Sequence, residues 1–529
     1  MPWLSAILLL PLAGALSLLA VPPQGRIQAR VHALIASGGA LALAGIVVAL
    51  FDRDAAGLQF VDHHGWAERV GLSYDVGVDG ISLWLVLLTT GLFFLAIVAA
   101  SVRLPERGRA FLGLLLLAET GLIGLFVAGD LVLFYVFWEA MLVPFYLLIG
   151  IWGGRDRGPA TLTFVIYTMA GSLIMLVAIL ATAFVAEDHT GQLTFAIQDL
   201  RGVPFTTAQS TWLFAGFALA FAIKLPLWPF HGWLPSAYAQ APILVTGLLA
   251  AVMSKAGVYG LLRIGLPVFP EGADNFAVPL GVLAVVGIVY GSLLAWRAPT
   301  MRLLVAYSSL AHLGFIVLGI VAFDVIGAQG AVLQMVNHGL VVAALFAIVG
   351  IIAARTGRER IDEVSGLAAG APRLAGVFLI VAMAALAVPG SNAFVGEFFI
   401  LVGVFRHHVW LAVLASIGIV YAAVYTLRLY QTTMNGPALP GARRAELRAP
   451  DALYLVPLVL ALLLIAFWPA SLVGATRASV ERAIAPAQVA AGRDPAEIRA
   501  VVVANPPAEN LPLPGDEAAG EGTSGEGAP

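Results

Sequence analysis

The chain has 529 residues, of which 60% are hydrophobic and 11% charged, with a mean hydropathy of +0.94 and a net charge of −3. This apolar content exceeds what a soluble protein of this length buries, so we expect an all-α polytopic protein of the lipid bilayer, with no nucleic-acid partner. The absence of cysteine excludes disulfides and cysteine-ligated iron–sulfur clusters, no P-loop motif is present, and we predict no cofactor or metal site in this chain.

About fourteen apolar segments are long enough to cross a membrane, at about 20 residues per crossing. In chain order they cover 3–20, 31–50, 81–101, 110–126, 131–152, 160–186, 211–230, 242–266, 277–296, 301–323, 331–354, 371–401, 409–430 and 452–468. The first has no cationic leader, so we expect it to be retained rather than cleaved. The predicted domains are 1–109 (helices 1 to 3), 110–266 and 277–430 (five helices each), 452–470 (helix 14) and 471–529, a short amphipathic piece and a largely disordered acidic tail.

Positive charge is concentrated in alternate loops. These loops hold Arg26, Arg30, Arg103, Arg107, Arg109, Arg155, Arg157, Arg297, Arg302, Arg355, Arg358, Arg360, Arg373, Arg443, Arg444 and Arg448. The intervening loops are acidic and hold Asp52, Asp54, Asp62, Glu68, Asp75, Asp79, Glu187, Asp188, Glu271 and Asp274. Arginine-rich loops usually stay in the cytoplasm, so the pattern predicts a multi-pass protein of the cell membrane with both termini on the outer side.

The seventh predicted helix, FAIKLPLWPFHGWLP, is interrupted by proline. Pro226 and Pro229 lack backbone donors, so we expect free carbonyl oxygens at Ala222 and Leu225. These oxygens would lie beside Lys224.

The twelfth predicted helix, LAVPGSNAFVGEFF, is interrupted as well. Pro389 would free the carbonyl of Ala385, and Gly390 would let the chain turn. Ser391 or Asn392 can cap the helix that resumes. The broken helix is fourth in each group of five, helices 4–8 and 9–13, which predicts two inverted repeats around a site near the bilayer midplane.

Five ionisable residues fall inside apolar segments, and they include both lysines of the chain: Glu119, Glu139, Lys224, Lys255 and Glu397. Each costs about 2.5–3.5 kcal/mol if charged at the centre of a lone helix, so partners are expected. Structural ion pairing is one explanation, and a genome poor in lysine codons is another for the scarcity of lysine. The alternative is proton transfer, because burial disfavours a charged lysine whereas a nearby carboxylate favours it. We predict that Glu139 pairs with Lys224.

Two histidines lie on predicted helices 10 and 11, His312 in SSLAHLGF and His338 in QMVNHGL. They are either hydrogen-bonded packing residues or a proton relay between the lysines and Glu397, and we favour the relay. His231, just after the break in helix 7, either lines an entry or lies at the membrane interface. The remaining histidine pairs are too short a pattern to indicate a metal.

Five segments resemble the antiporter-like subunits of proton-pumping NADH:quinone oxidoreductase, respiratory complex I. They are FYVFWEAMLVPFYLLIGIWG, FAIKLPLWPFHGWLPSAYAQAP, MSKAGVYGLLR, YSSLAHLGF and VPGSNAFVGEF, and the resemblance covers helices 3 to 14. Glu397 favours the M type, called subunit 4 in mitochondria, because the L and N types resemble each other in carrying lysine there. Glu119 matches a helix 4 carboxylate of the M type.

The resemblance implies a proton translocase subunit in which Glu139 and Lys224 interact, Lys255, His312 and His338 form a central relay, and Glu397 is the terminal proton site. It also implies that NADH, FMN, iron–sulfur clusters and quinone bind partner subunits, that this chain catalyses no redox step alone, and that L and N subunits are its neighbours. A subunit of a multisubunit Na+/H+ antiporter, or a membrane subunit of an energy-converting hydrogenase, remains the alternative.

Overall fold

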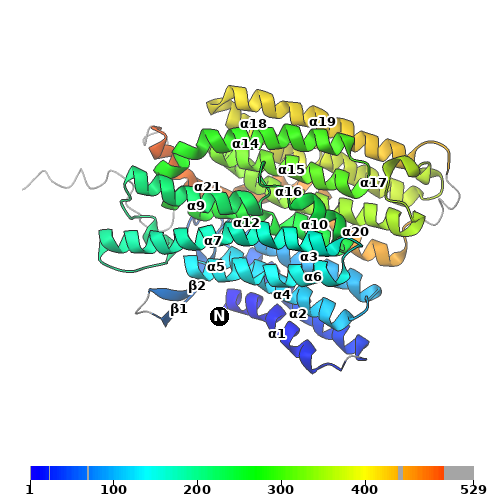
Figure 1. Ribbon diagram of the computed structural model, residues 1–529, viewed down its shortest axis with the longest axis horizontal. Helices are drawn as coiled ribbons and strands as arrows, with labels where there is room; N and C mark the ends of the chain where they lie inside the picture. Colours follow the sequence, from blue (N-terminus) through cyan, green and yellow to red (C-terminus); the bar gives the residue numbers. More distant parts are fainter. Residues whose placement is uncertain (1, 23, 68–70, 439–444, 494–529) are drawn as a thin grey trace, which may run out of the picture.

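The computed structural model describes residues 2–22, 24–67, 71–438 and 445–493, most of which are helical. The helices lie side by side along one direction (Figure 1). Twelve helices of the described part are long and apolar enough to cross a membrane, which confirms the predicted all-α polytopic fold. They are α1 (Trp3–Ala20), α2 (Arg26–Leu50), α3 (Ser82–Val102), α4 (Gly108–Val127), α5 with α6 (Leu131–Ala140 and Leu142–Trp152), α7 (Arg157–Thr190), the segment α11 to α13 (Ile243–Val268), α14 (Pro270–Arg297), α15 (Met301–Val321), α16 (Val325–Thr356), α19 (Val409–Met434) and α20 (Ala449–Phe467).

The two remaining predicted segments are the ones expected to be broken, and both are split. The first consists of α9 (Thr207–Lys224) and α10 (Leu234–Gln240), and the second of α17 (Pro372–Ala385) and α18 (Asn392–His407). Short helical turns connect other elements: α8 (Ile197–Leu200), η4 (Ile361–Glu363) and η5 (Leu367–Ala369). The relation between the two groups of five helices as inverted repeats stays a prediction.

Burial separates central from peripheral helices. The most apolar windows of α15 and α16 are 94% and 89% buried inside the protein, whereas those of α7 and α20 are 44% and 28% buried. The peripheral helices expose large apolar side chains, among them Val177 and Phe184 on α7 and Leu460 and Leu464 on α20. Apolar surface of this extent is typical of helices that face lipid.

Two further elements lie at one end of the bundle, one of them not predicted and the other predicted only in part. An antiparallel hairpin, β1 (Gln59–Ala67) and β2 (Leu72–Val78), pairs His64 with Tyr74. The second is α21 (Pro469–Ala490), a 22-residue helix that packs against α13, α14 and α16. Both lie at the left end of the bundle in Figure 1, which we call the hairpin end. The short amphipathic piece predicted after residue 471 corresponds to this helix, which is longer than expected. The predicted acidic tail, 494–529, lies outside the described residues.

Candidate functional site

The first broken helix places Lys224 at the last residue of α9, in the interior of the protein. The backbone after it does not leave the carbonyl of Ala222 free, because the N–H of Leu227 donates to that oxygen at 2.8 Å. The indole N–H of Trp233 likewise donates to the carbonyl of Ile223 at 2.9 Å. The prediction of a free Ala222 oxygen is therefore wrong, because the chain after Pro226 turns back and supplies a donor.

The ammonium of Lys224 lies over an aromatic ring. Its Nζ is 4.8 Å from the centroid of the Trp138 ring, and no described residue accepts a hydrogen bond from it. Glu139 acts on Lys224 through space, but no ion pair within 4.0 Å joins them in the described part of the chain. Glu139 therefore lies close enough to Lys224 to act on its charge but forms no salt bridge with it, and the Trp138 ring stabilises the ammonium by a cation–π contact.

Glu139 lies beside the junction between α5 and α6, which are separated by Met141. Its Oε1 is buried and has no hydrogen-bond partner among the described residues. A buried carboxylate oxygen without a donor is costly. This carboxyl can therefore gain from a change in protonation or position.

Lys255 lies on α12 (Lys255–Gly260), between two π-helical turns, η2 (Leu249–Met253) and η3 (Leu261–Gly265). Its Nζ donates to the carbonyl of Ala250 at 2.7 Å and lies 3.4 Å from Ser254 Oγ. A π turn opens the regular helix ladder, which lets a side chain bond a main-chain oxygen. Lys255 therefore sits in a backbone site shaped by the irregular helix.

The helices that carry the two lysines approach closely. A Cβ on Gly257 of α12 would lie 2.4 Å from the carbonyl oxygen of Phe221 on α9, so only glycine fits at this contact. The contact lies three residues before Lys224 on one helix and two residues after Lys255 on the other. The two lysines thus belong to one packed pair of helices.

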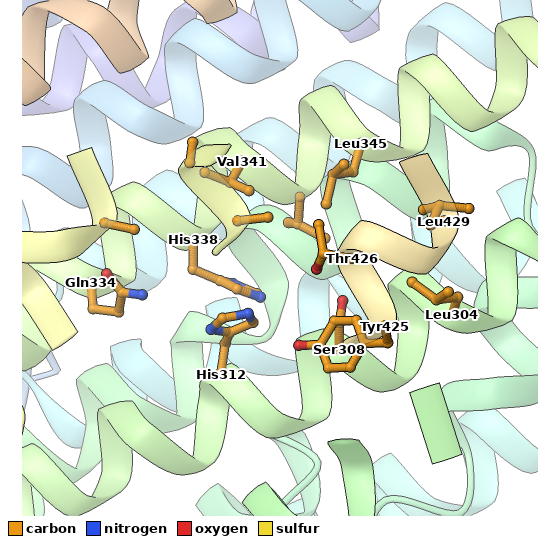
Figure 2. Close-up of a pocket in the computed structure, with 14 residues that line it drawn as sticks. Leu304, Ser308, His312, Gln334, His338, Val341, Leu345, Tyr425, Thr426 and Leu429 are labelled. Carbon is orange, nitrogen blue, oxygen red and sulfur yellow. The ribbon is translucent and has the colours of Figure 1, made fainter. Parts of the chain in front are cut away.

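A series of neighbouring polar side chains starts at Lys255, with one step, between the two histidines, that no hydrogen bond spans among the described residues. Its Nζ lies 2.6 Å from Nδ1 of His338, and the rings of His338 and His312 have centroids 5.6 Å apart. Nδ1 of His312 lies 2.9 Å from Oε1 of Glu397. Figure 2 shows the two histidine rings turned toward each other from α15 and α16. All four side chains are buried, so the helices bring together the four residues that the predicted relay requires.

Gln334 contacts Glu397, the last residue of this series of polar side chains. Its Nε2 donates to Oε1 of Glu397 at 3.0 Å, so His312 and Gln334 meet the same carboxylate oxygen. Sequence reasoning missed Gln334, although the quoted segment QMVNHGL begins with it and places it four residues before His338, on the same face of α16.

A cavity adjoins the histidines, and Figure 2 shows ten of its fourteen lining residues labelled. Besides His312 and His338 it is lined by hydroxyls of Ser308, Tyr425 and Thr426. The volume open to water centres is about 20 Å³, which is enough for one water molecule. Eight of the fourteen lining residues are apolar, and the polar groups lie together on the side of the histidines. The cavity is large enough to hold one water molecule beside these groups.

Two asparagines connect the second broken helix to the neighbouring helix α16. Nδ2 of Asn337 donates to the carbonyl of Asn392 at 2.7 Å, and Nδ2 of Asn392 donates to Oδ1 of Asn337 at 3.0 Å. Gly390 has the positive φ of 92° that the predicted turn requires. Neither Ser391 nor Asn392 caps α18 with its side chain, so that prediction is wrong. Asn392 instead connects the start of α18 to Asn337 on the neighbouring helix α16.

Two candidate residues lie apart from this chain. Glu119 is fully buried on α4, where Ser37 of α2 donates to its Oε1 at 3.0 Å. His231, between α9 and α10, packs edge-on against the ring of Tyr290, with centroids 5.3 Å apart. No hydrogen bond or ion pair of the described residues links either of them to the lysines or to Glu397.

Comparison with known proteins identifies similar chains over nearly the whole length. The family model described as "NADH:quinone oxidoreductase/Mrp antiporter, TM" matches residues 128–422. The chain is 37% identical over 521 residues to NADH-quinone oxidoreductase subunit M of Mycobacterium tuberculosis, covering 91% of this chain and 93% of that one. It is 39% identical over 480 residues to subunit M of Rhodobacter capsulatus, covering 88% and 93%.

Two solved structures share the fold. A chain of respiratory complex I from Thermus thermophilus with bound NADH aligns with a TM-score of 0.83 and 34% identity, over 93% of this chain and all of that one (100%). A chain of the Mrp complex from Dietzia sp. DQ12-45-1b aligns with a TM-score of 0.80 over 95% and 100% of the two chains, at 24% identity. The second similarity concerns the fold alone.

Proposed function

Because the chain belongs to the NADH:quinone oxidoreductase/Mrp antiporter family of membrane proteins, we propose that it is subunit M of a NADH-quinone oxidoreductase, complex I, and that it moves protons across the membrane. Redox chemistry takes place on other subunits, which bind NADH, FMN, iron–sulfur clusters and quinone. The full-length similarity to subunits of that name supports this function. The neighbouring membrane subunits are of the L and N type, and both termini of the chain face the outer side.

The observation that carries the role of individual residues is the polar chain from Lys255 to Glu397. Lys224, which Glu139 and the Trp138 ring hold charged, passes its proton to Lys255 when Glu139 moves away or is neutralised. Lys255 donates to His338 over 2.6 Å, and the proton moves on through His312 to Glu397. Water in the adjoining cavity bridges what the side chains do not span.

Energy for this transfer comes from the partner subunits. Moving one charge against 100 mV costs about 2.3 kcal/mol. The chain must therefore change the relative proton affinities of its groups in each cycle. A static pore would dissipate the gradient.

Substitution of Lys255 in the assembled complex tests this role. We expect Lys255→Ala and Lys255→Arg both to abolish proton translocation, because arginine keeps the charge but cannot release a proton. Translocation per NADH oxidised is measured in membrane vesicles, with the amount of this chain in the purified complex as the assembly control. Glu481→Gln, which removes a buried carboxylate of α21 outside the polar chain, should pump normally. Normal pumping by Lys255→Arg would contradict the assignment.

A multisubunit Na+/H+ antiporter is the second candidate, because the Mrp chain shares the fold over 95% of this chain. The two functions predict different partners. Purification of the chain with intact partners should bring down flavin and iron–sulfur subunits if it belongs to complex I. Isolation with small membrane subunits alone would support the antiporter.

A further inference from the structure

A second polar cluster lies at the hairpin end of the bundle, away from the polar chain. It surrounds a hollow between the hairpin, the loop after α8 and helix α21, with about 260 Å³ of space that protein atoms do not fill, including the part open to solvent. The polar residues that line it are Asp79, Gln198, Arg201, Arg263, Ser479 and Arg482. Three of the six carry a permanent positive charge, and one carries a negative charge.

The two arginines nearest to Asp79 share its charge. Arg263 is 4% exposed, and its Nη1 donates to Oδ2 of Asp79 at 3.0 Å, while its Nε has no partner in the described part of the chain. Asp79 is occupied further by the backbone N–H groups of Ile81 and Ser82, which bond its Oδ1 at 3.0 and 2.9 Å. Both oxygens of this carboxylate therefore already accept hydrogen bonds, and few acceptor positions remain for a second arginine.

Arg201 is that second arginine. No described residue accepts a hydrogen bond from its guanidinium, and its Nε is buried. Burial and the like charges of Arg263 and Arg482 lower the pKa of Arg201 to about 9, against the opposing effect of Asp79. Arg201 as a whole is partly exposed, but its Nε is buried without an acceptor among the described residues. A buried guanidinium donor that lacks an acceptor is destabilising, and an anion at this position would satisfy it.

The hollow has an excess of positive charge even when Arg482 is not counted. Arg482 donates to Oε1 of Gln198 at 3.3 Å and has further interactions. Among the residues that line the hollow, Arg201 and Arg263 still share one carboxylate, that of Asp79, while Asp75 outside the lining acts on Arg263 only. The lining itself therefore has one positive charge in excess. Guanidinium groups present paired N–H donors that match the oxygens of a phosphate or a carboxylate.

We propose that this hollow binds a small oxyanion of the phosphate class, held by Arg201 and Arg263 with Ser479 and Gln198 as additional donors. The anion connects the start of α3, the loop after α8 and α21, all of which contribute lining residues. Its source is either free inorganic phosphate or the phosphate of a lipid headgroup, since the hollow lies at the end of the bundle where headgroups of a bilayer would be.

Thermal unfolding of the purified full-length chain in detergent tests the proposal. At constant sodium concentration, replacing gluconate by inorganic phosphate should raise the unfolding midpoint, and above Kd the midpoint should keep rising with the logarithm of the phosphate concentration. A ligand of the folded state stabilises it in proportion to ln(1 + [L]/Kd). Arg201→Met should abolish the phosphate effect, whereas the matched variant Arg360→Met, an exposed arginine at the opposite end, should keep it. An equal phosphate effect in Arg201→Met would overturn the proposal.

Two further measurements remain decisive if Arg201→Met does not fold. Equilibrium dialysis of the wild-type chain with radiolabelled phosphate should give one bound phosphate per chain, and no binding to either delipidated or lipid-containing protein would overturn the site. In nanodiscs, phosphatidylglycerol should suppress the phosphate effect if a headgroup is the natural occupant, whereas an intact phosphate effect in phosphatidylglycerol discs indicates free phosphate.

Discussion

At the scale of single residues, the environment of Lys224 distinguishes this site from an ordinary salt bridge. A carboxylate in direct contact would hold the ammonium firmly, whereas the Trp138 ring at 4.8 Å stabilises it without accepting its proton. Glu139 is near enough to act through space. The ammonium is therefore held by a group that cannot move the proton, and a small displacement of Glu139 can change its charge state.

This arrangement predicts the effect of removing the ring. Trp138→Leu withdraws about 1–2 kcal/mol of stabilisation from the charged lysine, so we expect the pumping rate of the assembled complex to fall by about tenfold. Trp138→Phe keeps an aromatic face, so its pumping rate should fall much less. Proton translocation and NADH oxidation are measured in the same vesicles. Equal losses in both variants would show that the ring acts through packing.

At the scale of elements, the positions of the helices could be predicted from the sequence better than the contacts between individual side chains and main-chain groups. Length and hydropathy located the spanning helices and both breaks, and the buried ionic residues Lys255, His338 and Glu397 identified the polar chain. Trp138 and Tyr425 could not be recognised, because an aromatic residue in an apolar helix is far more often packing than function. The free carbonyl at Ala222 was mispredicted because local rules do not say where the chain goes after a proline.

Helix α21 was predicted only as a short amphipathic piece, for a different reason. Its sequence is rich in alanine and contains Pro486, so its hydropathy is too low for a spanning helix. The buried residues Leu472, Thr476, Val480 and Ile484 nevertheless recur at intervals of four, which is the spacing of one helix face. This spacing was present in the sequence and predicts a helix that lies on the bundle.

The break in the second half yields a prediction about the asparagine pair. Asn337→Ala removes both hydrogen bonds, whereas Asn392→Ala removes only one, because the carbonyl of Asn392 remains available to Asn337. A buried polar group left without its partner costs about 1–3 kcal/mol, so we expect Asn337→Ala to lower the unfolding midpoint more than Asn392→Ala. The double variant should resemble Asn337→Ala alone. Equal and additive effects of the two single variants would mean that these two hydrogen bonds do not stabilise the contact between α16 and the start of α18.

Helix α21 carries a pH-dependent element outside the spanning helices. Burial raises the pKa of Glu481 above its usual range, and the hydrogen bond from Arg477 at 2.8 Å opposes this only in part. A carboxyl whose pKa is higher in the folded state weakens that state as the pH rises through its unfolded and folded values. Glu481→Gln should therefore raise the unfolding midpoint at pH 7, with a gain that fades toward pH 4.5. A lower midpoint at pH 7 would show that the ion pair with Arg477 outweighs burial.

At the scale of the whole molecule, hydrogen bonds between loops show which of them share an end of the bundle. At one end, Gly154 N bonds Gln240 O at 2.7 Å and Met301 N bonds Glu359 O at 3.0 Å. At the hairpin end, Leu131 N bonds Phe195 O at 2.9 Å. The first end gathers the loops whose arginines predicted a cytoplasmic side. The hairpin end also carries arginines that the loop pattern left out, Arg201, Arg406, Arg477, Arg482 and Arg493.

Because arginines lie at both ends of the bundle, measuring the orientation tests the rule that arginine-rich loops face the cytoplasm. Several of those at the hairpin end lie on or beside α21 or in the cationic hollow, where they are paired or partly buried, and charges close to the ends of spanning helices weigh most in setting orientation. We therefore expect the hairpin end to face outward. Because the chain contains no cysteine, single cysteines report their own accessibility. Trp66→Cys on the exposed hairpin and Glu363→Cys on the exposed η4 turn mark the two ends.

A membrane-impermeant maleimide added to spheroplasts should label Trp66→Cys and leave Glu363→Cys unmodified, and inside-out vesicles should give the reverse. Solubilised protein, in which both sites are open, gives the reference level of labelling for each variant. Labelling of Glu363→Cys in intact spheroplasts would place the arginine-rich loops outside. Both termini would then lie in the cytoplasm, and the sides of the membrane from which the polar chain takes up and releases protons would be exchanged.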